Sequence, residues 1–174
     1  QLLQPFLEDV TRELREATMA TIYQNGMAVC VARAMPPRQL SVDIRVGDRM
    51  EAYCTAHGKI WLAHISARER RKYLSSVKLQ PLTDRTITDQ AQLEAEIDLA
   101  RERGFAYNMG EREDGISAIA VPVLTRTGRM VAGLSVFGPT SRISRDVLDS
   151  ARERLVTAAS QASVALYGRG LTED

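Results

Sequence analysis

The sequence predicts an α+β domain in which an antiparallel sheet is covered by helices on both faces. Two pairs of apolar, strand-like runs are each joined by a short turn, one at Asn25-Gly26 and one at Thr127-Gly128. Apolar residues at helical spacing open and close the chain. Hairpins pair neighbouring strands antiparallel, so the helices are left to cover the two faces of the sheet.

The first part of the chain predicts a helix and three strands. Helical spacing of apolar residues covers 2–18, and Pro5 is tolerated in the first turn of this helix. The runs 19–24 and 27–33 are expected to be strands, and the second is apolar on both sides, which favours a place inside the sheet. Alternation over residues 40–46 is typical of a third strand with one face in water.

Four further helices are predicted, most of them from residues that cap their ends. Thr55 is the expected N-cap of a helix to about Ile65, and a second short helix follows over residues 66–74. After a loop over 75–88, a helix capped by Thr88 or Asp89 runs to Arg103 and is stopped by the next glycine. Ser144 is expected to cap a long last helix that Gly168 ends.

The central hairpin combines the runs 115–124 and 130–138. Along its second strand, side chains alternate between a face with Gly133, Ser135 and Phe137 and a face with Met130, Ala132, Leu134 and Val136. The second face is predicted to be core. The first has two small or polar positions, Gly133 and Ser135, and is predicted to form the wall of a cavity. Pro122 in the first strand is expected to mark a bulge or a sheet edge.

Composition narrows the class of protein. A chain of 174 residues is expected to form one domain that needs no metal or disulfide, and a net charge of +1 with interspersed signs does not favour a nucleic-acid surface. Two cysteines, no secretory leader and no apolar run of membrane-spanning length favour a reduced, cytoplasmic setting and no membrane partner. The chain opens on Gln1, so we expect it to be part of a longer protein.

Few residues indicate chemistry by themselves. The stretch 55–59 is not a phosphate-binding loop, because Tyr53 and Ile60 stand where that motif needs Gly and Ser or Thr. A helix that begins at Thr55 nevertheless exposes backbone N–H groups that suit an anionic oxygen. His57, His64 and Cys54 lack the further ligands of a metal site, so neither a metal nor a cofactor is expected. Cys54 is interpreted as a buried thiol, Trp61 as packed against the sheet, and the basic run 68–72 as a solvated helix face.

Four sequence landmarks resemble the effector-binding domain of the IclR family of bacterial transcription regulators. In order they are Val46-Gly47 with Tyr53-Cys54-Thr55-Ala56-His57-Gly58-Lys59; Gly104-Phe105 with Glu111 and Gly115; Ile119-Ala120-Val121-Pro122-Val123; and Leu134-Ser135-Val136-Phe137-Gly138-Pro139. The resemblance covers essentially the whole chain and implies a GAF-like fold over residues 1–174. It further implies a winged helix-turn-helix domain before Gln1, contact with operator DNA only through that domain, and a homodimer or homotetramer.

The resemblance also implies an effector pocket between the sheet and the helix that begins near Thr55. Carried over by position, its residues are Val42, Ala56, His57, Asn108, Ile116, Ala118, Ser135 and Phe137. This chain departs from the family in having Asn108 at an often acidic position, Phe137 at an often serine position, and no polar group at Ala118. A pocket with an aromatic wall favours a partly apolar or aromatic acid. His57 is expected either to donate to an effector carboxylate as a cation or to point into solvent.

Three hypotheses follow. The first is a ligand-sensing and oligomerisation domain of a transcription regulator, which is not an enzyme and which responds to an organic or aromatic acid. The second is a small GAF-like enzyme that uses Cys54 or His57. The third is an oligomerisation module in which Phe137 fills the pocket.

Overall fold

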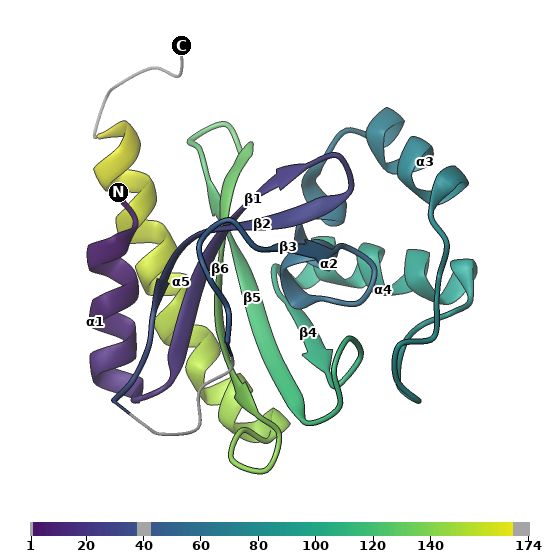
Figure 1. Cartoon of the computed structure of the whole chain (residues 1–174). Coiled ribbons are helices and arrows are strands. Elements are labelled where there is room, and N and C mark those ends of the chain that lie inside the picture. Colours follow the sequence, from purple (N-terminus) through teal and green to yellow (C-terminus); the bar gives the residue numbers. More distant parts are fainter. Residues whose placement is uncertain (1, 38–42, 169–174) are drawn as a thin grey trace.

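The computed structural model, described for residues 2–37 and 43–168, is built on one six-stranded antiparallel sheet (Figure 1). Its strand order is β3-β2-β1-β6-β5-β4. The elements are α1 (Gln4–Leu14), β1 (Ala17–Gln24), β2 (Met27–Ala34), β3 (Arg49–Glu51), α2 (Ala56–His64), α3 (Ala67–Ser76), α4 (Gln90–Arg103), β4 (Ala106–Met109), β5 (Ile116–Leu124), β6 (Met130–Pro139) and α5 (Arg145–Tyr167). The predicted α+β class is confirmed.

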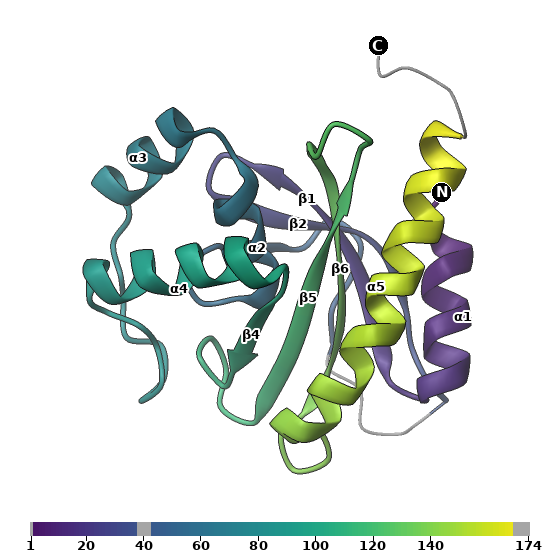
Figure 2. The same cartoon turned by 180° about the vertical axis from the view of Figure 1, so that it is seen from behind.

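Helices cover both faces of the sheet, as predicted. Helices α1 and α5 lie side by side on one face, while α2 and α4 lie on the other (Figures 1 and 2). Each face has its own core. The α1/α5 core contains Leu134 and Val136 of β6, and the α2/α4 core contains Phe137 and Trp61. The sheet therefore separates two cores, and Phe137, predicted for the effector pocket, belongs to the α2/α4 side.

The first helix is shorter than the predicted range 2–18. It ends at Leu14 because Arg15 adopts a left-handed conformation, with φ of 58°, and its N–H caps the Thr11 carbonyl. Ala17 then starts β1 and pairs with Phe137 of β6. Ala17 fits the helical spacing of apolar residues, but it belongs to a strand because pairing with β6 outweighs the local pattern.

The strand predicted over residues 40–46 is wrong where it can be compared. Residues 43–45 form no strand, Val46 is exposed, and residues 38–42 lie outside the described part of the chain. The backbone instead turns through Gly47, with φ of 96°. The Gly47 N–H donates to the Cys30 carbonyl at 2.8 Å, and the Asp48 carbonyl accepts from the Cys30 N–H at 2.9 Å. Only Arg49–Glu51 then pairs with β2, so the edge strand is short and begins later than alternation indicated.

The hairpin of β5 and β6 carries the predicted faces with one exception. Ala132, Leu134 and Val136 face the α1/α5 core, but Met130 belongs to the α2/α4 core. A register shift between Val123 and Leu124, which changes the pairing next to Met130, explains the difference. Pro122 was predicted to mark a bulge or a sheet edge. It lies close to this register shift, and it lies beyond Ala120, the last residue of β5 that pairs with β4, so both features are found near it. The sequence had left the position of β4 open.

Helix starts follow the predicted caps at Thr55, Asp89 and Ser144, and Ser66, predicted as the first residue of its helix, is a cap as well. The side chains of Thr55, Ser66, Asp89 and Ser144 each accept a hydrogen bond from the third residue that follows. Gly104 closes α4 in a left-handed conformation. Over residues 2–37 and 43–168, no helix combines the length and the apolar character needed to cross a membrane.

Candidate functional site

A small cavity of about 50 Å³ lies between the N-terminus of α2 and the sheet. Seven of the eight residues predicted for the effector pocket line it: Ala56, His57, Asn108, Ile116, Ala118, Ser135 and Phe137. The eighth, Val42, lies outside the described residues. The fold therefore brings together side chains from β4, β5, β6 and α2 that are up to 81 positions apart, from Ala56 to Phe137.

Six further lining residues were missed: Met19, Ile44, Met50, Thr55, Arg112 and Glu113. Met19 is paired with Ser135 across β1 and β6, and directly paired residues share a face. The register of these two strands would have found it, but no local pattern reveals that register. Arg112 and Glu113 lie in the turn between β4 and β5, within the landmark that begins at Glu111.

The N-terminus of α2 is held tightly against the backbone at Ala52. Thr55 Oγ1 accepts from the Gly58 N–H at 3.0 Å and donates to the Glu51 carbonyl at 2.8 Å. A Cβ at Gly58 would lie 2.1 Å from the Ala52 Cα, so only glycine permits this approach. Among the described residues nothing accepts from the N–H groups of Ala56 and His57, which are the first two of the helix. The cavity thus has a helix N-terminus with open donors on its wall.

His57 is buried, so the expectation that it points into solvent was wrong. The alternative, donation to an effector carboxylate as a cation, stays a prediction that the surroundings of the ring oppose. His57 is 2 % exposed, and its Nδ1 and Nε2 each lie 2.7 Å from a hydroxyl oxygen, those of Thr21 and Ser135. Trp61 Nε1 donates to the same Thr21 oxygen at 3.0 Å. Burial lowers the pKa of His57 to about 3, so its imidazole is neutral near neutral pH.

A second part of the lining, which we call the rim, is formed by Asn108 of β4 and by Arg112 in the turn that follows, and it carries an amide and a guanidinium. Asn108 Oδ1 accepts from the Glu111 N–H at 2.8 Å, which leaves its Nδ2 donors without an acceptor among the described residues. Arg112 donates to Glu51 and Glu113, at 2.7 Å in each case, and remains partly exposed. Because Glu113 is already paired, the polar groups of the cavity that lack partners are donors.

A buried ion pair fixes this rim to α2. Lys59, 2 % exposed, places its Nζ 2.7 Å from Glu111 Oε1 and donates to the Tyr107 carbonyl at 2.9 Å. Glu96 of α4 lies 3.8 Å from the same ammonium group. Since Glu111 immediately precedes Arg112, this pair sets the position of the cavity rim relative to the helix.

Phe137 is both a wall of the cavity and a buried core residue, 2 % exposed. The volume of about 50 Å³ is small beside the ~150 Å³ of an apolar cavity that admits benzene. Side chains at the wall must therefore move before an aromatic ring fits.

The cysteines and the second histidine do not form a reactive group. Cys54 is fully buried, and burial raises the pKa of its thiol to about 12, which opposes thiolate chemistry. Cys30 is buried as well. His64 contacts the Ile60 carbonyl through Nδ1, at 2.9 Å, and lies apart from the cavity lining. In the described part of the chain, no three His, Cys, Asp or Glu side chains gather as metal ligands would.

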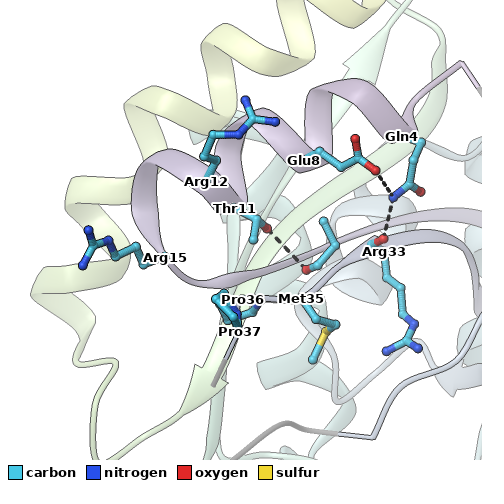
Figure 3. A pocket seen from close by; sticks show the side chains of 10 residues that line it. Gln4, Glu8, Thr11, Arg12, Arg15, Arg33, Met35, Pro36 and Pro37 are labelled. Atoms are coloured by element: carbon cyan, nitrogen blue, oxygen red, sulfur yellow. Dashed lines mark hydrogen bonds between the residues drawn. The ribbon is translucent and has the colours of Figure 1, made fainter. Parts of the chain in front are cut away.

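A much larger cleft, of about 760 Å³, lies between α1 and the end of β2 (Figure 3). Its polar contacts hold the fold together: Gln4 donates to the Arg33 carbonyl and Thr11 to the Ala34 carbonyl. Eight of its ten lining residues are exposed or partly exposed, so its volume reflects an open surface. None of the seven predicted site residues that the structure describes lies there.

The sequence matches the family described as "Bacterial transcriptional regulator IclR C-terminal" over residues 1–164. It is 35% identical over 159 residues to the Pca regulon regulatory protein of Pseudomonas putida, a match that covers 91% of this chain and 55% of that protein. The chain thus spans about half the length of this relative.

Solved structures show the same fold. The Thermotoga maritima IclR structure superposes with a TM-score of 0.87 at 28% identity, covering 94% of this chain and 66% of that one. A double mutant of the inducer-binding domain of the PobR transcription factor from Acinetobacter, in complex with 3-hydroxybenzoic acid, gives a TM-score of 0.85 at 27% identity, with 92% and 94% covered. The chain therefore belongs to the IclR family of bacterial transcriptional regulators, as a C-terminal domain of that family.

Proposed function

We propose that this chain senses a small organic acid in the cavity at the N-terminus of α2. The observation that supports the proposal is the donor character of the unpaired polar lining, which consists of the N–H groups of Ala56 and His57 and the Asn108 amide. A carboxylate is the small ligand that accepts from such a set, and a helix N-terminus favours its negative charge.

The apolar part of the lining favours an aromatic acid. Met19, Ile44, Met50, Ile116 and Phe137 surround the polar groups with hydrocarbon and one ring. Such a lining suits a ring with few polar substituents. The inducer-binding domain of PobR is a relative whose structure holds an aromatic acid, 3-hydroxybenzoic acid.

For the intact protein, we propose a cytoplasmic homodimer or homotetramer in which a winged helix-turn-helix domain outside this chain contacts operator DNA. Effector binding would then change operator affinity by shifting the population of subunit arrangements. The fact that this chain spans 55% of the Pseudomonas regulator leaves room for such a domain.

One rival has a specific observation in its favour. The small volume of the cavity, about 50 Å³, is what an oligomerisation module with a pocket filled by Phe137 would show. The enzyme alternative has no such support, because Cys54 is buried with a raised thiol pKa and both ring nitrogens of His57 are bonded within the core.

Thermal unfolding against a panel of benzoate, 3-hydroxybenzoate, 4-hydroxybenzoate and pyruvate tests the proposal. An effector at about 100 times its dissociation constant adds about 2.7 kcal/mol to the free energy of unfolding, which raises the midpoint by roughly 5 to 10 °C. Ser135→Ala should remove at least about half of the rise, because one hydrogen bond to a charged ligand is lost, whereas Ser160→Ala, on the exposed side of α5, should preserve it. A panel without any rise, or a rise that Ser135→Ala leaves unchanged, would refute the pocket assignment.

A further inference from the structure

We infer that Trp61, Thr21 and His57 form a hydrogen-bond relay of fixed direction, which leaves the hydroxyl hydrogen of Ser135 free to donate to the effector. His57 is then a positioning residue that acts through Ser135. The part of the inference that concerns the ligand rests on the proposed function, whereas the direction of the relay does not.

The direction originates at Trp61. An indole N–H is a donor only, and Trp61 Nε1 donates to Thr21 Oγ1 at 3.0 Å. Thr21 is fully buried, and its hydroxyl has one other neighbour in the described structure, His57 Nδ1 at 2.7 Å. If Nδ1 donated to Thr21, the Thr21 hydroxyl hydrogen would be buried without an acceptor. The Thr21 hydroxyl therefore donates to Nδ1.

His57 passes the direction on. A neutral imidazole that accepts at Nδ1 carries its hydrogen on Nε2. The imidazole is neutral because burial holds its pKa near 3, and no carboxylate contacts either ring nitrogen. Its Nε2–H then donates to Ser135 Oγ at 2.7 Å.

Ser135 ends the relay at the cavity wall. Its oxygen accepts from His57, so its own hydrogen has no partner within the relay. Ser135 is as buried as Thr21, but only Ser135 lines the cavity, so its hydrogen can meet an acceptor bound there whereas the Thr21 hydrogen cannot. With the opposite tautomer, Ser135 would donate to His57 and offer only lone pairs to the cavity. The relay thus selects an effector with an oxygen acceptor at this wall, such as a carboxylate or a carbonyl, over one with an amine there.

Gly133 leaves the space that the relay occupies. A Cβ at this position would lie 2.8 Å from His57 Nδ1 and 3.0 Å from Thr21 Oγ1. Any larger residue would press on the hydrogen bond that fixes the tautomer. The absence of a side chain at this point of β6 therefore allows the imidazole to reach both hydroxyl groups.

Nitrogen-15 NMR of the histidine rings tests the relay without any ligand. The chain has two histidines, so His64→Gln assigns the His57 signals. We expect hydrogen on Nε2 and a bare Nδ1 in the unaltered chain and in Thr21→Ser, which keeps the hydroxyl. Thr21→Val and Trp61→Phe, which remove the intermediate and the origin of the relay, should give a mixture of tautomers. Hydrogen on Nδ1 in the unaltered chain would overturn the inference.

Calorimetric titration with 3-hydroxybenzoate tests the consequence for binding. Ser135→Ala removes the hydrogen bond to the charged ligand and should weaken affinity about ten- to hundredfold. Thr21→Val only mixes the tautomers and should weaken affinity about twofold if the two are equally populated, whereas Thr21→Ser should bind as the unaltered chain does. Unchanged affinity in Thr21→Val, together with a changed tautomer, would overturn the role of the relay in selection. If neither this acid nor any other of the panel binds, while the Nε2 tautomer is found, the effector proposal fails and the direction of the relay stands.

Discussion

Acidification is predicted to destabilise this domain through His57. The buried imidazole has a folded-state pKa of about 3, because burial disfavours its charged form, whereas an exposed imidazole titrates near 6.5. Between these values the unfolded chain binds a proton that the folded chain does not. The free energy of unfolding contributed by this group is therefore complete above about pH 6.5 and falls as the pH decreases toward 3.

The size of the effect follows from the separation of the two pKa values. Each pH unit below 6.5 costs about 1.4 kcal/mol, because one pKa unit corresponds to that free energy. At about pH 5 the folded state should have lost about 2 kcal/mol relative to pH 7.5. For a chain of this length, the loss corresponds to a midpoint lower by roughly 4 to 8 °C.

Urea unfolding at both pH values, in the unaltered chain and in His57→Gln, isolates this contribution. Each protein loses some free energy of unfolding between about pH 7.5 and about pH 5, and the quantity of interest is the difference between these two losses. Other titrating groups contribute equally to both losses and cancel in the difference. His64, whose pKa is also lowered by burial, is one of them. The difference should be about 2 kcal/mol. Equal losses in the two proteins would refute the reasoning, because they would mean that His57 titrates normally in the folded state.

Three substitutions test the packing around the site by urea unfolding. Lys59→Met should cost about 3–5 kcal/mol because it leaves the Glu111 carboxylate buried without its cation, and Lys59→Met combined with Glu111→Gln should recover most of the loss. Phe137→Ala should cost about 3–5 kcal/mol because it removes a buried ring. Gly58→Ala should cost at least about 3 kcal/mol or prevent folding, because its Cβ overlaps the Ala52 backbone.

Each of these expectations has a contrary result. A double variant at positions 59 and 111 that is no more stable than Lys59→Met would show that the loss does not come from an unpaired carboxylate. A Phe137→Ala loss below about 1 kcal/mol would mean that the neighbouring side chains collapse into the space. An unfolding midpoint of Gly58→Ala equal to that of the unaltered chain would show that α2 can move away from Ala52.

Much of the candidate site was predictable because its residues lie at positions that local rules fix. Ser135 and Phe137 share a face through the two-residue period of a strand, and Thr55 starts a helix because its side chain can cap it. The family resemblance then identified these elements as the walls of one pocket. Residues from other elements, such as Met19 and Arg112, were missed because their place depends on strand register and on a turn.

By itself, the sequence determined the helix caps, the two hairpin turns and the apolar faces, since these depend on neighbours within one or two turns of chain. Tertiary structure decided where α1 gives way to β1, which three residues form β3, and which face Met130 takes, because long-range pairing and a register shift override local periodicity. It also decided the state of His57. Nothing near position 57 in the sequence indicates that Thr21 and Ser135 enclose the ring. Burial between them keeps the ring neutral and hydrogen-bonded at pH values between about 3 and 6.5, where an exposed imidazole is a cation.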